Sequence, residues 1–113
     1  MNITLSLSEI NNDNIFICKQ EQNKSNKNNL YYKLNYILTD YTLYGIYIII
    51  DKNINTTKIR NIESYILSKI SKTPKFNIYN NLYQNRISHQ GKVLRIIGIW
   101  ENDYHCGLNY KII

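Results

Sequence analysis

Alanine is absent from this sequence of 113 residues, which also contains only two cysteines, one proline and one tryptophan. The two cysteines, Cys18 and Cys106, are too few for a disulfide framework, and no charged segment followed by an apolar stretch and a small-residue cleavage site opens the chain. The longest apolar run, residues 46–50, is far too short to cross a bilayer. These absences predict a cytoplasmic protein with reduced thiols and no membrane partner.

The spacings typical of metal and catalytic sites are missing as well. The sequence has no CxxC or HxxxH spacing, no Walker-type loop and no dinucleotide fingerprint. Asp103, His105 and Cys106 form the one local group of reactive residue types, but adjacent His and Cys do not reproduce a zinc spacing, and neighbours on a strand point apart. We therefore expect no metal, no cofactor and no enzymatic activity.

Positive charge is in excess. Lys and Arg outnumber Asp and Glu by 14 to 8, which gives a formal charge of +6 and favours acidic partners such as nucleic acid. Ile, Asn, Lys and Tyr dominate the composition and Ala is absent, as expected of an AT-rich coding sequence. This origin leaves open whether the charge reflects function or nucleotide bias.

Alternating apolar residues predict strands along most of the chain, and its length fits a single domain. Between the second and third of these strands, residues 19–29 contain no apolar side chain and are predicted to form a mobile surface loop. The predicted strands lie at residues 3–7, 15–18, 30–38, 43–50, 91–100 and 108–113.

Two hairpins follow from this pattern. Residues 30–38 place alternate Leu and Tyr side chains on one face and Tyr31, Lys33 and Asn35 on the other, and a short turn leads to residues 43–50, which we expect to be central in the sheet. Gly45 interrupts this second strand and indicates a bulge or a close backbone approach. Residues 98–113 have the form of a second hairpin around an acidic, Gly-closed turn.

One amphipathic helix is predicted over residues 56–71. Ile59, Ile62, Ile66 and Ile70 recur at helical spacing behind possible N-caps at residues 55–57, and Pro74 ends the pattern. Residues 75–90 are predicted to form a strand and a loop. The fold class is therefore α+β, a mostly antiparallel sheet of five to seven strands with one packed helix; whether the sheet curls toward a barrel stays open.

The leading functional hypothesis is non-enzymatic binding of nucleic acid, with a preference for single strands. Such proteins combine a basic groove with aromatic rings on which bases stack. Tyr is also common in sheets because its ring packs well on a pleated surface, so each ring has a competing structural explanation. The candidate binding residues are Tyr31, Lys33, Tyr83, Arg86, Lys92, Arg95, Trp100 and Lys111.

Two blocks of the sequence, NYILTDYTLYGIYIIID (residues 35–51) and LRIIGIWENDYHCGLNYKII (residues 94–113), resemble small, largely uncharacterised proteins of nucleocytoplasmic large DNA viruses. In those proteins a strand with an LxGIY core is followed by a terminal GIWE…GLxYK hairpin. The resemblance implies a viral protein of the host cytoplasm, in the viral factory, or of the virion, and supplies no functional residues. The closing GLNYK is also similar to the end of viral single-stranded DNA-binding proteins, which have an oligonucleotide-binding barrel.

An alternative hypothesis is a protein interaction or virion-assembly module. Such a module would use a sheet edge or the C-terminal hairpin to bind a protein partner or a second copy of the chain. The two hypotheses differ in whether basic and aromatic side chains converge on one surface.

Overall fold

A computed structural model describes residues 4–22, 30–50, 54–83 and 92–113, with the backbone alone for residues 19–22 and 83. Seven strands and two α-helices follow two short 3-10 helices, η1 (Leu7–Glu9) and η2 (Asn12–Asn14). In chain order they are β1 (Ile15–Gln22), β2 (Leu30–Ile37), β3 (Thr42–Tyr44), β4 (Ile46–Ile50), α1 (Thr56–Leu67), β5 (Thr73–Lys75), α2 (Asn77–Tyr83), β6 (Lys92–Glu101) and β7 (His105–Ile112).

The strands form one mixed sheet in the order β1-β2-β6-β7-β5, with β3 paired to β2 and β4 paired to β6. All pairs are antiparallel except β5 with β7. The predicted α+β class with a mostly antiparallel sheet is confirmed. The sheet is not closed, because its end strands β1 and β5 do not pair, so the barrel-like option is wrong.

The sheet forks where β3 passes into β4. Strands β2 and β6 pair directly only from Leu30 to Lys33; beyond that, β3 continues the hydrogen bonding to β2 and β4 continues it to β6. Gly45 joins the two short strands at a φ of 107°, a left-handed conformation that glycine adopts without strain. The interruption at Gly45 is confirmed, and the predicted hairpin is confirmed for β2 and β3; residues 46–50, predicted to belong to the same hairpin, pair with β6 instead.

Strand β4 is less central than predicted. It has β6 on one side, but on the other side only a bridge to Leu5, whose N–H donates to the Tyr47 carbonyl and whose carbonyl accepts from the Ile49 N–H, both at 2.8 Å. Leu5 therefore forms only an isolated β-bridge, and η1 begins at Leu7. The strand predicted at residues 3–7 is wrong for residues 4–7, the part that the structure describes. Since β1 continues to Gln22, the predicted loop is also wrong at residues 19–22; its remainder, 23–29, lies outside the described residues.

Helix α1 begins at Thr56, as predicted, and the Asn55 side chain accepts a hydrogen bond from the Lys58 N–H at 3.1 Å. The helix ends at Leu67 rather than at residue 71, because the chain tightens there into i→i−3 bonds from Lys69 and Ile70. Its apolar spacing places Ile59, Ile62 and Ile66 in the core.

A second helix, α2, replaces the strand predicted after residue 75. Ile78 and Leu82, four residues apart, are both buried. The backbone N–H groups of Ile78 and Tyr79 donate to the carboxylate of Glu63 in α1, at 3.2 and 2.7 Å. The N-terminal N–H groups of α2 are therefore satisfied by a residue from another helix.

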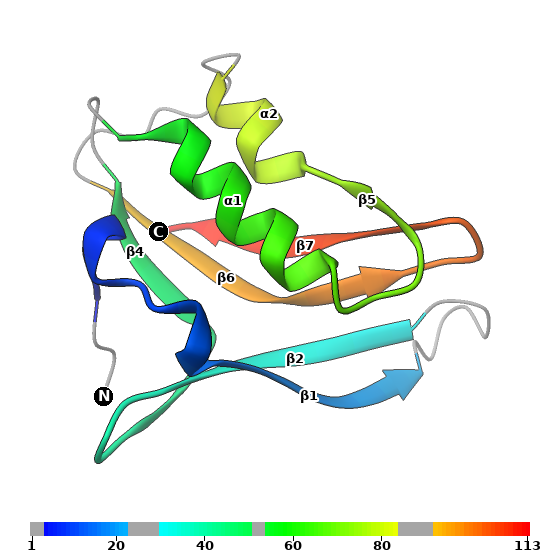
Figure 1. Ribbon diagram of the computed structural model, residues 1–113, viewed down its shortest axis with the longest axis horizontal. Helices are drawn as coiled ribbons and strands as arrows, with labels where there is room; N and C mark the ends of the chain where they lie inside the picture. The colour runs from blue at the N-terminus through cyan, green and yellow to red at the C-terminus, as the bar shows by residue number, and fades with distance from the viewer. Residues whose placement is uncertain (1–3, 23–29, 51–53, 84–91) are drawn as a thin grey trace.

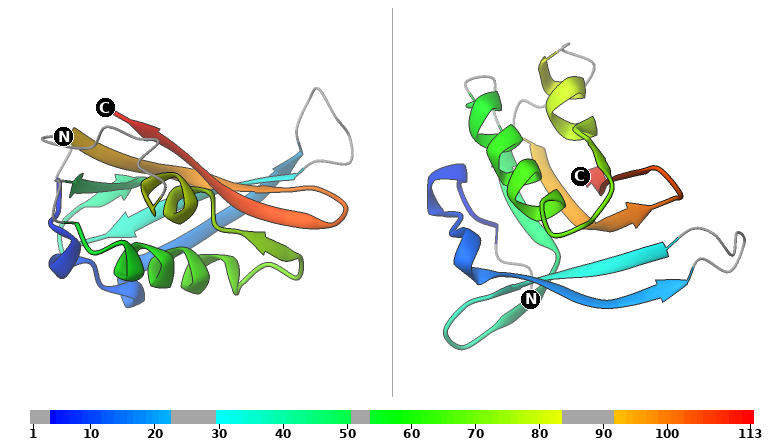
Figure 2. Two further views of the ribbon diagram at one scale, coloured as in Figure 1. Left: turned by 90° about the horizontal axis from the view of Figure 1, so that it is seen from above. Right: turned by 45° about the vertical axis from the view of Figure 1, so that its right-hand side comes forward.

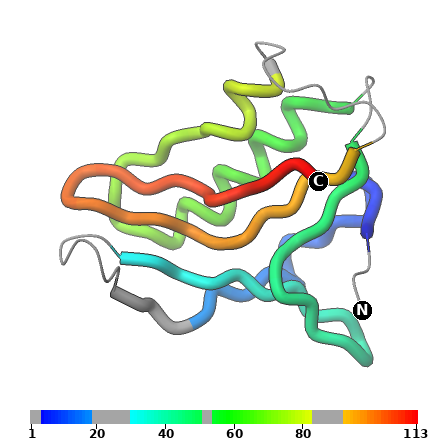
Figure 3. Tube along the Cα trace, turned by 180° about the vertical axis from the view of Figure 1, so that it is seen from behind, coloured from blue at the N-terminus to red at the C-terminus, as the bar shows by residue number. Residues whose placement is uncertain are grey.

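Both helices cover the same face of the sheet (Figures 1 and 2). Among the described elements, no helix or strand covers the opposite face, which Figure 3 shows from behind. The core lies between helices and sheet, and its most deeply buried side chains are Leu34, Tyr36, Ile46, Ile48, Ile50, Ile59, Ile66, Leu67, Ile78, Leu82, Leu94 and Ile96.

The predicted closing hairpin is confirmed as β6 and β7, but its turn is shorter than predicted, because β7 begins at His105 and Gly107 pairs with Trp100 inside the hairpin. Its turn is held by Asn102, whose side-chain oxygen accepts from the N–H groups of Tyr104 and His105 at 3.0 and 2.8 Å. Beyond the hairpin, β5 adds three residues in parallel to β7, with Pro74 in the middle position.

Candidate nucleic-acid interface

Strand alternation divides the strand side chains between a covered face, toward the helices, and an open face. Five of the eight predicted binding residues share the open face. Tyr31 pairs with Trp100, Lys33 with Gly98, and Arg95 with Lys111, on the three neighbouring strands β2, β6 and β7. We call this set of five, Tyr31, Lys33, Arg95, Trp100 and Lys111, the open-face array.

The other three predicted residues do not join the array. Lys92 pairs with Ile50 and alternates with Leu94, so the register assigns it to the covered face at the end of the sheet. Tyr83 is the last residue of α2, in the helical layer rather than in a loop. Arg86 lies outside the described residues.

Two glycines leave room for the aromatic rings of the array. A Cβ atom at Gly107 would lie 2.5 Å from the Trp100 ring, and one at Gly98 would lie 2.7 Å from the Tyr31 hydroxyl oxygen and 2.9 Å from its ring. Because these contacts are shorter than any real Cβ contact, each ring lies against the glycine of the next strand. Tyr31 and Trp100 are partners in the register and both are partly exposed, so neighbouring rings line the open face.

Two cations of the array face each other across neighbouring strands. Arg95 and Lys111 are direct cross-strand partners, an arrangement in which like charges destabilise a sheet. None of the strand residues with described side chains on this face is acidic; Glu21, on the edge strand, pairs with Tyr31 through its backbone. The Arg95 guanidinium carbon lies 5.3 Å from the centre of the Tyr47 ring.

A hollow of about 300 Å³ opens at the fork of the sheet. It exists because β3 stays with β2 while β4 leaves with β6, so the side chains of β2 and β6 diverge there. Three array residues, Tyr31, Lys33 and Arg95, line it together with Asn35, Tyr44 and Ile97.

Sequence reasoning missed the contribution of Tyr44, which is 75% exposed. The sequence predicts Asn35 on the polar face of its strand but gives it no place in a site. The sequence did contain a signal for Tyr44, because this residue directly precedes Gly45, the glycine that interrupts the strand. Tyr44 and Asn35 lie near Arg95 and Ile97 because β4 pairs with β6, and no local pattern in the sequence specifies this pairing.

The covered face holds acidic groups with satisfied partners. The Tyr32 hydroxyl donates to Glu101 at 2.8 Å, and the Lys72 ammonium lies 3.5 Å from the same carboxylate. Burial, followed by the hydrogen bond to Glu101, raises the pKa of Tyr32 to about 12. Burial also raises the pKa of Glu63 to about 7, although the N–H groups of Ile78 and Tyr79 oppose the shift.

His105 and Cys106 lie on opposite faces of β7. Cys106 is fully buried beside Glu101, and its pKa is raised, first by burial and then by the Glu101 charge. The thiol therefore stays protonated, unlike a nucleophilic thiolate. In the part of the chain that the structure describes, no three His, Cys, Asp or Glu side chains come close enough to hold a metal ion.

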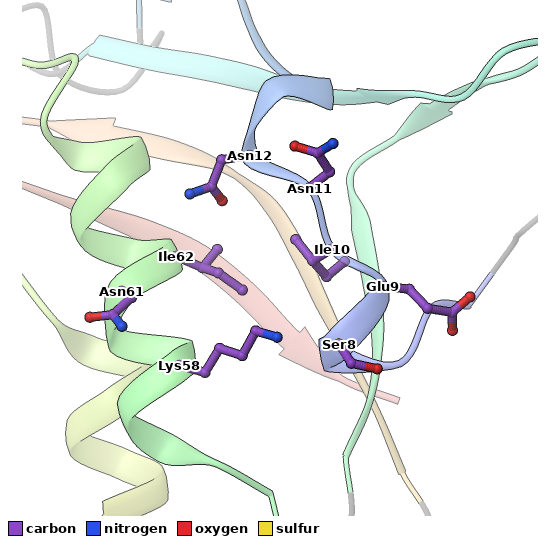
Figure 4. Close-up of a pocket in the computed structure, with 8 residues that line it drawn as sticks. All are labelled: Ser8, Glu9, Ile10, Asn11, Asn12, Lys58, Asn61 and Ile62. Atoms are coloured by element: carbon purple, nitrogen blue, oxygen red, sulfur yellow. The ribbon is translucent and has the colours of Figure 1, made fainter.

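A second hollow, of about 610 Å³, lies between the N-terminal 3-10 helices and α1 (Figure 4). Lys58 extends its ammonium into it and Asn12 points toward α1, whereas the Glu9 carboxylate points away. That carboxylate accepts hydrogen bonds from the Ser6 N–H and hydroxyl at 2.9 and 2.8 Å. The lining contains one cation and no aromatic ring, so it lacks the combination found on the open face.

Comparisons of the chain with protein-family models, with curated proteins and with solved structures give no match. Within the described ranges, no helix has the length and apolar character needed to cross a membrane.

Proposed function

We propose that the protein binds single-stranded nucleic acid on the open face of its sheet. The observation that carries this proposal is the pairing of Tyr31 with Trp100 on the same face as the pairing of Arg95 with Lys111. Bases of a single strand would stack on the two rings, and phosphates would meet the cations at the sides. The role is binding, with no chemical step.

The charge distribution supports this proposal more directly than the net charge does. Coding bias adds Lys and Tyr anywhere in a sequence, but it does not place two cations opposite each other on one face. Such a pair costs stability until an anion neutralises it. A polyanion with unpaired bases meets both the cations and the rings.

Trp100 is the only tryptophan, so the intrinsic fluorescence of the full chain reports on the array. Titration with a thymidine decamer should quench this emission as a base stacks on the indole, with an affinity that falls steeply as salt is raised from about 50 to 200 mM. Tyr31→Ala should weaken binding by about 5-fold to 100-fold, the range expected for one lost stack.

Tyr104→Ala is the matched control, because Tyr104 is 75% exposed but lies in the turn of the β6–β7 hairpin rather than in the array. It should bind as tightly as the unchanged protein. No binding of single-stranded DNA or RNA at low salt would contradict the proposal. Equal losses in the two variants would show that the array is not the site.

A protein partner is the second candidate, favoured by apolar side chains at the other end of the open face. Phe16 and Ile37, near Tyr44, are 47% and 39% exposed, and Ile49, on the other arm of the fork, is 50% exposed. The outer edge of β1 has no strand partner among the described residues. Light scattering that finds only monomer, with no partner recovered from the infected host, would argue against this candidate.

The resemblance to proteins of large DNA viruses supports a location in the viral factory or the virion for the proposed activity. Replication there produces single-stranded intermediates, which are substrates of the proposed kind. Immunolocalisation in infected cells, with the viral DNA stained, tests this part of the proposal separately from binding.

A further inference from the structure

The hollow at the fork of the sheet holds an Arg whose hydrogen bonding is incomplete. The Nε atom of Arg95 is buried and has no hydrogen-bond partner among the described residues. Its position is confined, because a Cβ atom at Gly45 would lie 3.8 Å from this nitrogen and the Tyr47 ring lies beneath the guanidinium. A buried polar group without a partner destabilises the free protein.

The surroundings of Arg95 are those of a planar ligand. Tyr31 and Tyr44 lie at the two ends of the hollow, since Tyr44 pairs with Asn35, four residues along β2 from Tyr31. Leu34 and Ile97 add aliphatic surface to the lining, and Lys33 adds a second cation. A phosphate is best held by exposed cations, whereas rings and an aliphatic wall favour a flat, partly apolar ring.

We propose that the hollow binds one unpaired base of the strand and prefers guanine, an inference that rests on the proposed function. Arg95 supplies only donors, so the base must present acceptors side by side. Guanine does so through O6 and N7, the pair that arginine most often contacts in specific recognition. Asn35, with an amide donor and acceptor, is placed to contact a second edge.

The test compares four thymidine decamers that carry guanine, adenine, cytosine or thymine at one central position. The guanine decamer should bind about 5-fold to 100-fold more tightly than the others. A fifth decamer with 7-deazaguanine removes only the N7 acceptor, and it should lose most of this preference. This comparison needs no protein variant, so it does not depend on the folding of a mutant.

Arg95→Lys keeps the charge but removes the forked donors. It should abolish the guanine preference, measured as the ratio of the affinities for the guanine and thymine decamers, so that a uniform change in affinity does not affect the result. Lys69→Ala, which removes an exposed cation of the C-terminal turn of α1 on the helical side, is the control and should leave the preference intact.

The outcomes separate this inference from the proposed function. Equal binding of all decamers, or a preference for another base, would overturn the guanine slot and leave single-strand binding in place. The Arg95→Ala variant gives a second way to overturn the guanine slot. If it weakens binding of every decamer equally and lowers the slope of log affinity against log salt concentration by about 1, Arg95 contacts a phosphate rather than a base. Failure of all decamers to bind would overturn both.

Discussion

The two faces of the sheet use tyrosine in different ways. On the covered face, Tyr32 donates to Glu101, and the Tyr36 hydroxyl accepts from the Asn11 N–H at 3.0 Å. On the open face, Tyr31 lies against Gly98 and Tyr44 projects into solvent. Tyr31 and Tyr32 are adjacent in sequence, yet Tyr32 contributes to the fold, whereas Tyr31 lies on the open face and is available to a ligand. Composition alone does not distinguish these roles.

Charge is divided in the same way. Glu63 and Glu101 are buried on the covered side with donors beside them, whereas Arg95 and Lys111 stand opposite each other on the open face. If the open face is a binding surface, changes there should affect binding more than folding. Changes on the covered face should do the reverse.

The largest expected difference in stability is between two substitutions on β7. Leu108→Ala removes a buried side chain on the covered face and should lower the free energy of unfolding by about 2–5 kcal/mol, measured by urea denaturation. Lys111→Ala, on the open face, should leave stability unchanged or raise it by a few tenths of a kcal/mol, because it relieves repulsion with Arg95. It should nonetheless weaken oligonucleotide binding, and a stability loss as large as that of Leu108→Ala would erase the contrast between the faces.

Glu63 gives a pH-dependent version of the same contrast. Its pKa in the folded protein is raised from about 4.5 to about 7, so the folded state favours the protonated acid. The protonated Glu63 therefore stabilises the folded protein, and this stabilisation is complete below about pH 4.5. As pH rises through 7 it is lost, which lowers the free energy of unfolding by about 3 kcal/mol.

Glu63→Gln should remove this component of the pH dependence. Gln loses one of the two acceptors for the Ile78 and Tyr79 N–H groups, so the variant should be less stable at pH 4.5 and closer to the original protein at pH 8. Urea denaturation across this range measures the difference. Parallel stability curves for the two proteins would show that Glu63 keeps an ordinary pKa.

The smallest expected loss of stability is at Gly107. An added methyl group would meet the Trp100 ring, so Gly107→Ala should turn the ring away from β7 at a cost of about 1 kcal/mol. We expect a shifted tryptophan emission and weaker oligonucleotide binding. Unchanged emission together with unchanged binding would show that the glycine does not set the position of the ring.

The fold could be predicted from the sequence where local patterns determine it. Alternation identified β2, β6 and β7, and isoleucine spacing with Asn55 identified the start of α1. Helix α2 was missed because its Asn-rich sequence has low helix propensity and its N-terminal donors are satisfied by Glu63 from another helix.

The candidate site was only partly accessible to the same reasoning. The face of Tyr31 and Lys33 followed from alternation, but their position beside Trp100 depends on the pairing of β2 with β6, strands separated by more than fifty residues of chain. Lys92 was misplaced because the outward direction of a strand residue depends on register. The fork that creates the hollow depends on which strand each half of residues 42–50 joins.

The short parallel strand β5 has a consequence for self-association. Only three residues long and carrying Pro74, which has no N–H to donate, it offers almost no edge to an incoming strand. The eight-residue β1 at the opposite end is the one long free edge among the described strands. If β1 of a second copy pairs edge to edge with β1 of the first, the long free edges of both copies are occupied. Strand pairing then stops at a twofold dimer and cannot propagate into a fibre.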